Sequence, residues 1–222
     1  SSQPPPSRIK GRGSASNAEG RFESTVVETY DDGWYRDDGE AAAPPATTVT
    51  EETARTIISR NDSPDIPFDQ SLNPYRGCEH GCVYCYARPT HSYLNLSAGL
   101  DFETRLSAKT NTAERLRAEL GKRGYVVSPI NLGANTDPYQ PIERKYRLTR
   151  QVLEILAETR HPATIVTKSA NVLRDLDLLA PMARERLVQV FVSVTTLDNQ
   201  LASRLEPRAS APHRRLQAIG EL

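Results

Sequence analysis

The placement of the cysteines narrows the folds and functions open to this chain. All three cysteines lie in one short stretch, as Cys78, Cys82 and Cys85, with the spacing C-x3-C-x2-C. One loop can therefore bring three thiolates to a single soft metal centre. Three ligands on an iron–sulfur cubane would leave one iron open to a small molecule. The odd number of cysteines argues against a disulfide framework, so the stretch predicts a metal centre on a loop.

His80 keeps a second kind of metal site open. Together, Cys78, His80, Cys82 and Cys85 would form a Cys3His set for tetrahedral zinc. Zinc motifs usually divide their ligands into two separated pairs, and four ligands in this stretch would be crowded. Such a site would suit a zinc-stabilised nucleic-acid-binding module, with the basic segment 8–12 contacting phosphates. The alternative for segment 8–12 is a solvated tail.

From Phe68 onward the sequence alternates predicted strands and helices, which is typical of a parallel α/β sheet. A loop after the carboxyl end of a strand is where barrel active sites lie, and the cysteines follow the first strand. Two minor elements are a short helix over 86–94 and an extra strand over 102–109. The main strands are predicted at 70–73, 126–132, 163–167 and 188–195, and the main helices at 111–122, 146–160, from 171 onward and 212–222.

Residues 1–60 differ in character from the predicted core at 61–222. They are rich in proline, glycine and charge, so we expect a mostly irregular N-terminal extension. Aromatic residues such as Phe22 and Trp34 are its candidate anchors. Near its end, residues 50–52 resemble a helix start, whereas 56–59 suit a strand equally well.

Charge and hydropathy exclude some classes of protein. The chain has 28 basic and 28 acidic residues, so no general basic excess indicates a nucleic-acid partner. Its apolar runs are too short to cross a bilayer, and no secretory signal is visible, so no membrane partner is expected. Because cluster cysteines must stay reduced, the sequence predicts a cytoplasmic location.

Four segments carry a family resemblance: 73–78 (NPYRGC), 85–88 (CYAR), 135–141 (NTDPYQP) and 167–169 (TKS). With Tyr84 before the third cysteine, they resemble the radical SAM superfamily and its spore photoproduct lyase-like branch, from about residue 68 to the end. The resemblance implies a partial TIM-type (β/α) barrel with a [4Fe-4S] cluster on Cys78, Cys82 and Cys85. In that family the open iron binds S-adenosylmethionine (SAM). An electron from the cluster, supplied by a low-potential donor of the flavodoxin or ferredoxin type, releases a 5′-deoxyadenosyl radical that abstracts hydrogen from a substrate.

The resemblance also implies SAM contacts at the strand ends. Asn135, Thr136 and Asp137 follow the second strand, where the family holds the SAM amino group; the alternative is an Asx-type turn. Lys168 would meet the SAM carboxylate, unless it extends to solvent. Tyr84 would pack beside the cluster. Two later residues complete the expected set: Ser193 at the ribose or carboxylate, and Glu206 at the ribose hydroxyls. For Glu206, and for Arg208 as a contact to a substrate anion, the alternative is a surface ion pair.

The substrate stays open at this point. Spore photoproduct lyase uses an additional cysteine as hydrogen donor, and this chain has none beyond the cluster set. A tyrosine such as Tyr139 is a candidate replacement, and a nucleic-acid substrate is one candidate among others. The family barrel has about six βα units and the sequence predicts four, so the chain is expected to be C-terminally truncated. A non-catalytic iron–sulfur scaffold is therefore a further alternative.

Overall fold

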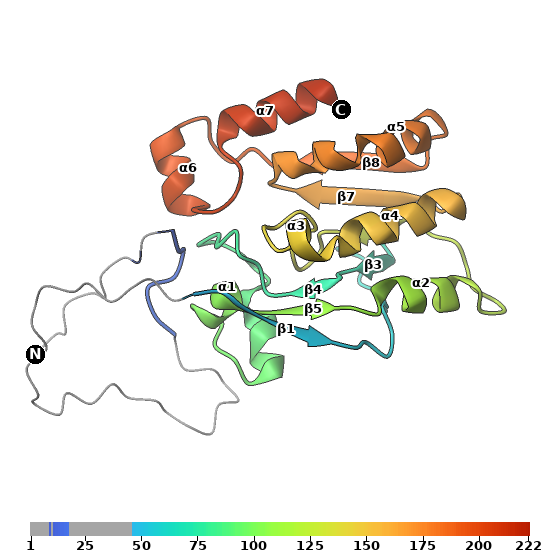
Figure 1. Ribbon diagram of the computed structural model, residues 1–222, viewed down its shortest axis with the longest axis horizontal. Coiled ribbons are helices and arrows are strands. Elements are labelled where there is room, and N and C mark those ends of the chain that lie inside the picture. The colour runs from blue at the N-terminus through green and yellow to red at the C-terminus, as the bar shows by residue number, and fades with distance from the viewer. Residues whose placement is uncertain (1–8, 10, 18–45) are drawn as a thin grey trace, which may run out of the picture.

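The computed structural model describes residues 9, 11–17 and 46–222 (Figure 1). The predicted anchors Phe22 and Trp34 lie outside the described residues. Among the described residues, no helix combines the length and the apolar character that crossing a bilayer requires. In chain order the elements are β1 (Thr48–Glu52), β2 (Ile58–Arg60), β3 (Gln70–Leu72), β4 (Tyr75–Arg76), η1 (Arg88–Leu94), α1 (Asp101–Thr104), β5 (Arg105–Lys109), α2 (Thr112–Leu120), β6 (Ile130–Leu132), α3 (Glu143–Tyr146), α4 (Leu148–Glu158), β7 (Ala163–Thr167), η2 (Ala170–Asp175), α5 (Leu176–Arg184), β8 (Val188–Val192), α6 (Asn199–Leu205) and α7 (Pro212–Glu221).

A five-stranded sheet forms the centre of the molecule, in the order β2-β3-β6-β7-β8. Strands β3, β6, β7 and β8 run parallel, and only β2 is antiparallel to its neighbour. Leu72, Ile130 and Ile165 on these strands are completely buried and pack in one cluster with Val152 and Leu156 of α4. The arrangement confirms the predicted α/β class and partial barrel.

A second, three-stranded sheet has the order β1-β5-β4. Strand β1 pairs in parallel with β5, from Thr48 opposite Arg105 to Glu52 opposite Lys109. The predicted helix start at Thr50 is therefore wrong, because this segment finds a strand partner far along the chain. Strands β1 and β2 also give regular structure to the end of the segment predicted to be mostly irregular.

Several predicted strands are shorter in the structure. Of 126–132, only Ile130–Leu132 is a strand, and Val126 is 68% exposed, because the partner β3 pairs only three residues. Of 102–109, residues 102–104 belong to α1, and β5 begins at Arg105. Of 188–195, only Val188–Val192 form strand β8, and Phe191 is 47% exposed, so one face of this strand lacks cover by the described elements.

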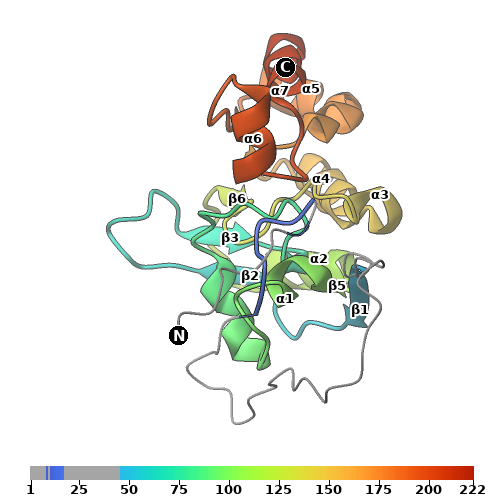
Figure 2. The same cartoon turned by 90° about the vertical axis from the view of Figure 1, so that its left-hand side faces the viewer.

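The predicted helices are confirmed, with differences at their ends. Helices α2, α4 and α7 lie within the predicted ranges, and the helix from 171 begins as the 3-10 helix η2 before α5. Ser169 caps η2 by accepting a hydrogen bond from the Asn171 N–H. Helices α6 and α7 lie beyond β7 and β8 at one end of the molecule (Figures 1 and 2).

Gly133 joins β6 to the loop that follows it. Its φ is +105°, and an added Cβ would lie 2.2 Å from the Val166 carbonyl oxygen on β7. We expect Gly133→Ala to lower the free energy of unfolding by more than about 1 kcal/mol, because both the backbone angle and the contact oppose a side chain. Urea denaturation would measure the loss. Gly220→Ala is the control: no atom lies within 4 Å of its Cβ position in helix α7, so stability should not fall.

Candidate active site

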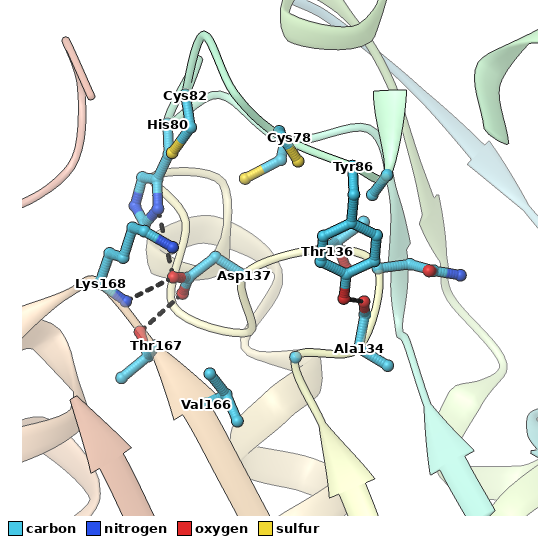
Figure 3. A pocket seen from close by; sticks show the side chains of 14 residues that line it. Cys78, His80, Cys82, Tyr86, Ala134, Thr136, Asp137, Val166, Thr167 and Lys168 are labelled. Carbon is cyan, nitrogen blue, oxygen red and sulfur yellow. Dashed lines mark hydrogen bonds and ion pairs between the residues drawn. The ribbon is translucent and has the colours of Figure 1, made fainter. Parts of the chain in front are cut away.

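Three loops meet at one pocket: the cysteine loop, which follows β3 by way of the two-residue strand β4, and the loops after β6 and β7 (Figure 3). This convergence follows from the parallel sheet, whose strands end at a common edge. The pocket contains the three cysteines and four of the predicted SAM contacts, whereas Tyr86 and Val166 were not predicted as site residues. The residues that line it are Cys78, His80, Cys82, Cys85, Tyr86, Ala87, Gly133, Ala134, Asn135, Thr136, Asp137, Val166, Thr167 and Lys168.

The three cysteines carry free thiols. Burial raises the pKa of Cys78 well above its usual value and that of Cys82 to about 12. In the described part of the chain, no three His, Cys, Asp or Glu side chains are arranged as a preformed metal site. The donor chemistry nevertheless fits iron, because three soft sulfur ligands from one loop line one pocket. Ligation would release the thiol protons, as metal binding to cysteine generally does.

Asp137 connects the cysteine loop to the sheet. One carboxylate oxygen accepts hydrogen bonds from Thr167 Oγ1 at 2.7 Å and from the Tyr139 N–H at 2.9 Å. The other accepts from the Lys168 N–H at 2.7 Å and lies 3.2 Å from His80 Nδ1. Burial alone would raise the pKa of Asp137, but His80 and these hydrogen bonds hold it below its usual value. The bond to Tyr139 is the Asx-type turn considered from the sequence, so Asp137 has a structural role whether or not it contacts SAM.

Both carboxylate oxygens of Asp137 already have partners, whereas the hydroxyl of Thr136 is available as a hydrogen-bond acceptor. Its residue is 5% exposed, and its Oγ1 has no hydrogen-bond partner among the described residues. The backbone N–H groups of Asn135 and Thr136 donate to Asn73 Oδ1 at 3.0 and 3.4 Å, so the side chain of Asn73 shapes this loop. An unpartnered buried hydroxyl is costly unless a ligand completes it.

Lys168 extends into the pocket beside the cysteine loop (Figure 3). Its Nζ lies 5.8 Å from the centroid of the Tyr84 ring. Tyr84 itself is 48% exposed and does not line the pocket; its hydroxyl bonds to Glu206 and to Thr195. The proposed contact between Tyr84 and the cofactors stays a prediction.

Ser193 and Glu206 are not among the residues that line the pocket. Glu206 is only 3% exposed and forms a buried ion pair with Arg215, at 2.5 Å from Nη2. Arg215 also donates to the Ser193 carbonyl oxygen at 3.0 Å. Glu206 is thus neither open to a ribose in this arrangement nor part of a surface pair, and its role and that of Ser193 toward SAM stay predictions. Arg208 pairs with Glu79 at 3.3 Å.

Tyr139 does not suit the role of hydrogen donor. Its side chain is completely buried in the main core cluster and is absent from the pocket lining. Tyr139 is only two residues from Asp137, which lines the pocket. Its side chain nevertheless packs in the core, after the Asx turn.

The buried carboxylate of Glu103 is connected to the cysteine loop through Arg88. Glu103 is completely buried and accepts hydrogen bonds from Arg88 Nη2 at 2.6 Å, Gly13 N at 3.0 Å and Ser14 N at 2.9 Å. Arg88 in turn donates to the Cys82 carbonyl oxygen through Nε at 3.0 Å and Nη2 at 2.9 Å. We call Gly13, Ser14, Arg88 and Glu103 the Glu103 clamp. It gives segment 11–17, drawn in blue beside α1 in Figure 2, a direct connection to the cysteine loop.

Arg12 belongs to the same region. It is 5% exposed, and its guanidinium donates to the Glu103 carbonyl oxygen at 3.0 Å and to Thr47 Oγ1 at 2.9 Å. Both interpretations of segment 8–12, a phosphate contact and a solvated tail, are therefore wrong for Arg12. Arg8 and Lys10 lie outside the described residues.

Comparison with known families identifies the chain. The family model described as Radical SAM superfamily matches residues 72–222, which include the cysteine motif and every parallel strand end in the pocket. The chain belongs to the radical SAM superfamily. This membership confirms the resemblance found in the sequence, and it does not favour the zinc-stabilised module.

Several relatives match about two thirds of the chain. The uncharacterized protein Rv2578c of Mycobacterium tuberculosis is 42% identical over 154 residues, which cover 69% of this chain and 45% of the relative. Uncharacterized protein MJ0683 of Methanocaldococcus jannaschii is 28% identical over 151 residues, covering 68% and 54%. Uncharacterized protein ORF301 of Acidianus two-tailed virus is 30% identical over 154 residues, covering 67% and 50%. The chain thus spans about half the length of these relatives.

Solved structures of spore photoproduct lyase share the fold. The lyase complexed with dinucleoside spore photoproduct matches with a TM-score of 0.55 and 18% identity, over 77% of this chain and 46% of the lyase. A double mutant of the lyase with bound AdoMet and dinucleoside spore photoproduct gives a TM-score of 0.52 and 20% identity over the same shares. At this identity the match establishes the fold alone, and it confirms the lyase-like architecture predicted from the sequence.

Proposed function

We propose that this chain is a radical SAM enzyme that holds a [4Fe-4S] cluster on Cys78, Cys82 and Cys85 and binds SAM at the open iron. The observation that carries the proposal is the convergence of the three thiols with polar ends of two further parallel strands on one pocket. When bound, the cluster and SAM would together supply a 5′-deoxyadenosyl radical that abstracts hydrogen from the substrate.

The residues of the pocket would bind and orient SAM. Thr136 Oγ1 has no partner within the described residues and can accept a hydrogen bond from the SAM ammonium. Lys168 Nζ forms no ion pair within the described residues and can pair with the SAM carboxylate. Asp137 holds the Lys168 backbone and His80 in fixed positions, and its ionised carboxylate adds negative charge near the ammonium.

Substrate and redox partner are further parts of the proposal. Nucleic acid is the first substrate class to test, because spore photoproduct lyase, which has the same fold, has been solved with a dinucleoside lesion. A low-potential flavodoxin or ferredoxin would supply the electron. Tyr84 and Tyr86, both exposed, lie on the loop that carries the cysteines and offer such a donor a surface close to the cluster ligands.

Electron paramagnetic resonance of the reduced protein, with and without SAM, tests the proposal. Anaerobic reconstitution should give a [4Fe-4S] signal whose g-values shift when SAM occupies the open iron. A cluster signal that ignores SAM would instead identify a non-catalytic iron–sulfur scaffold. A colourless protein with one bound zinc would identify the binding module.

Lys168→Met should weaken SAM binding about tenfold or more, because it removes a charge-assisted hydrogen bond of about 1.5–3 kcal/mol. The concentration of SAM that shifts half of the signal would measure this change. Lys122→Met is the matched control: Lys122 is exposed in the turn after α2 and should leave the SAM dependence unchanged. An equal SAM dependence in both variants would remove Lys168 from the site.

A further inference from the structure

A second cavity adjoins the cysteine pocket. Asn135 and Thr136 line both cavities, so they form part of the boundary between them. The second cavity is lined mainly by polar groups, and we call it the lysine pocket. Its lining includes Thr56, Ser59, Arg76, Lys109 and Thr136.

Lys109, at the end of β5, brings a charge to this cavity without a carboxylate partner. It is partly buried, and its Nζ donates to the Asn73 carbonyl oxygen at 2.7 Å. Within the described residues it forms no ion pair, whereas neighbouring Arg76 pairs with Glu52 at 2.8 Å. Burial, and then the charge of Arg76, lower the pKa of Lys109 to about 8. A partly desolvated ammonium of this kind favours a bound anion.

Three residues with hydroxyl groups line the lysine pocket together with Lys109. Thr136 lines both cavities, and its Oγ1 is buried and lacks a hydrogen-bond partner among the described residues. Thr56 and Ser59 add two further hydroxyls to the lining, both on exposed residues. Several donors around one cation match an oxyanion that has several acceptor oxygens, such as a phosphate.

We propose that the lysine pocket binds a phosphate group carried by the substrate, with Lys109 as its cationic contact. The binding itself follows from the pocket, while its role as a substrate subsite rests on the proposed radical SAM function. Because Thr136 borders both cavities, a phosphate held here would place the adjoining part of the substrate next to the cysteine pocket. Phosphodiesters and phosphomonoesters share this chemistry.

Isothermal titration calorimetry on the full chain, reconstituted with its cluster, tests the proposal. The probes are inorganic phosphate and a dinucleoside monophosphate, each in a constant chloride background. Lys109→Met should weaken binding of at least one probe about tenfold or more. Lys122→Met, which replaces an exposed lysine, should bind like the parent protein. Binding of the dinucleotide would assign a phosphodiester substrate, and binding of phosphate alone a phosphomonoester.

The pH dependence provides a second measurement that needs no folded Lys109→Met variant. A phosphodiester keeps one negative charge between pH 7 and 9, so a change in affinity must come from the protein. Lys109 is charged below its pKa and neutral above it, so affinity should fall as pH rises through about 8. The other charged or titratable groups that line this cavity or the cavity next to it are Arg76, His91, Arg55 and Glu52. Burial lowers the pKa of His91, so His91 is neutral between pH 7 and 9. Lys109→Arg should remove the fall.

Three results would overturn the proposal. The first is that neither probe binds the protein at millimolar concentration. The second is that Lys109→Met and Lys122→Met bind the probes equally well. The third is that the affinity of the protein for the dinucleoside monophosphate does not change between pH 7 and 9. The SAM-dependent resonance signal is recorded without a phosphate probe. A failure of the lysine pocket would therefore leave that signal intact, whereas a failure of the radical SAM function would abolish it.

Discussion

Cys82→Ala is expected to abolish cluster assembly and reduce SAM cleavage to background. Cys82 is one of only three cysteines in the chain, so no other thiol can replace it. Two remaining thiolates cannot hold a cubane of four irons in the way three do. Iron analysis and the visible absorbance of the reconstituted protein would measure the loss, and release of 5′-deoxyadenosine would measure cleavage. Equivalent losses are expected for Cys78→Ala and Cys85→Ala.

Val83→Ala is the control for these variants. Val83 lies on the same loop, is 44% exposed and carries no metal donor. Its backbone N–H donates to the Leu205 carbonyl oxygen at 2.9 Å, and alanine retains that bond. Its cluster content should match that of the parent chain. Full iron content in Cys82→Ala would show that the three cysteines are not a set of ligands.

Glu103→Gln is expected to lower the free energy of unfolding by about 3–5 kcal/mol, the range for a buried ion pair that loses one charge. The substitution leaves Arg88, whose side chain is 12% exposed, without its carboxylate. It also places an amide donor next to the Gly13 and Ser14 N–H groups, which both need an acceptor. The midpoint of urea denaturation, with an unchanged slope, would measure the effect.

The matched comparison is Glu158→Gln. Glu158 pairs with Arg117 at 2.5 Å, but both side chains are more than half exposed, so solvent screens the pair. Its denaturation midpoint should stay close to that of the parent chain. If Glu103→Gln unfolded at the same urea concentration as Glu158→Gln, the Glu103 clamp would contribute nothing to stability. Iron content of the folded Glu103→Gln protein would show separately whether the clamp also positions the cysteine loop.

Local patterns predicted the elements that depend on local chemistry. Residues 163–167 form β7 as expected. A short apolar run with β-branched residues is enough to predict a strand. The meeting of cysteine and strand-end residues in one pocket followed from the parallel order of the strands. Strand β6 was predicted too long, since its length is set by β3, and a partner's length is not visible in the segment itself.

Contacts between distant segments were beyond the reach of these patterns. Two such contacts are the pairing of β1 with β5 and the hydrogen bond from Gly13 to Glu103. Neither contact produces a periodic pattern in the sequence. The ion pair of Glu206 could not be predicted from the sequence for a related reason. Glu206 directly follows helix α6, and its partner Arg215 lies on the next helix, α7, so only the folded chain brings the two charges together.

The Glu103 clamp joins the cysteine loop to residues that lie before the region matched by the family model. The family model begins at residue 72, whereas two of the three residues that donate to the Glu103 carboxylate are Gly13 and Ser14. A recombinant fragment trimmed to 72–222 would keep all three cysteines. It would lack the two backbone N–H groups that donate to the Glu103 carboxylate. Poor iron retention in such a fragment would then reflect lost contacts, which include these two donors and strands β1 and β2, and not missing ligands.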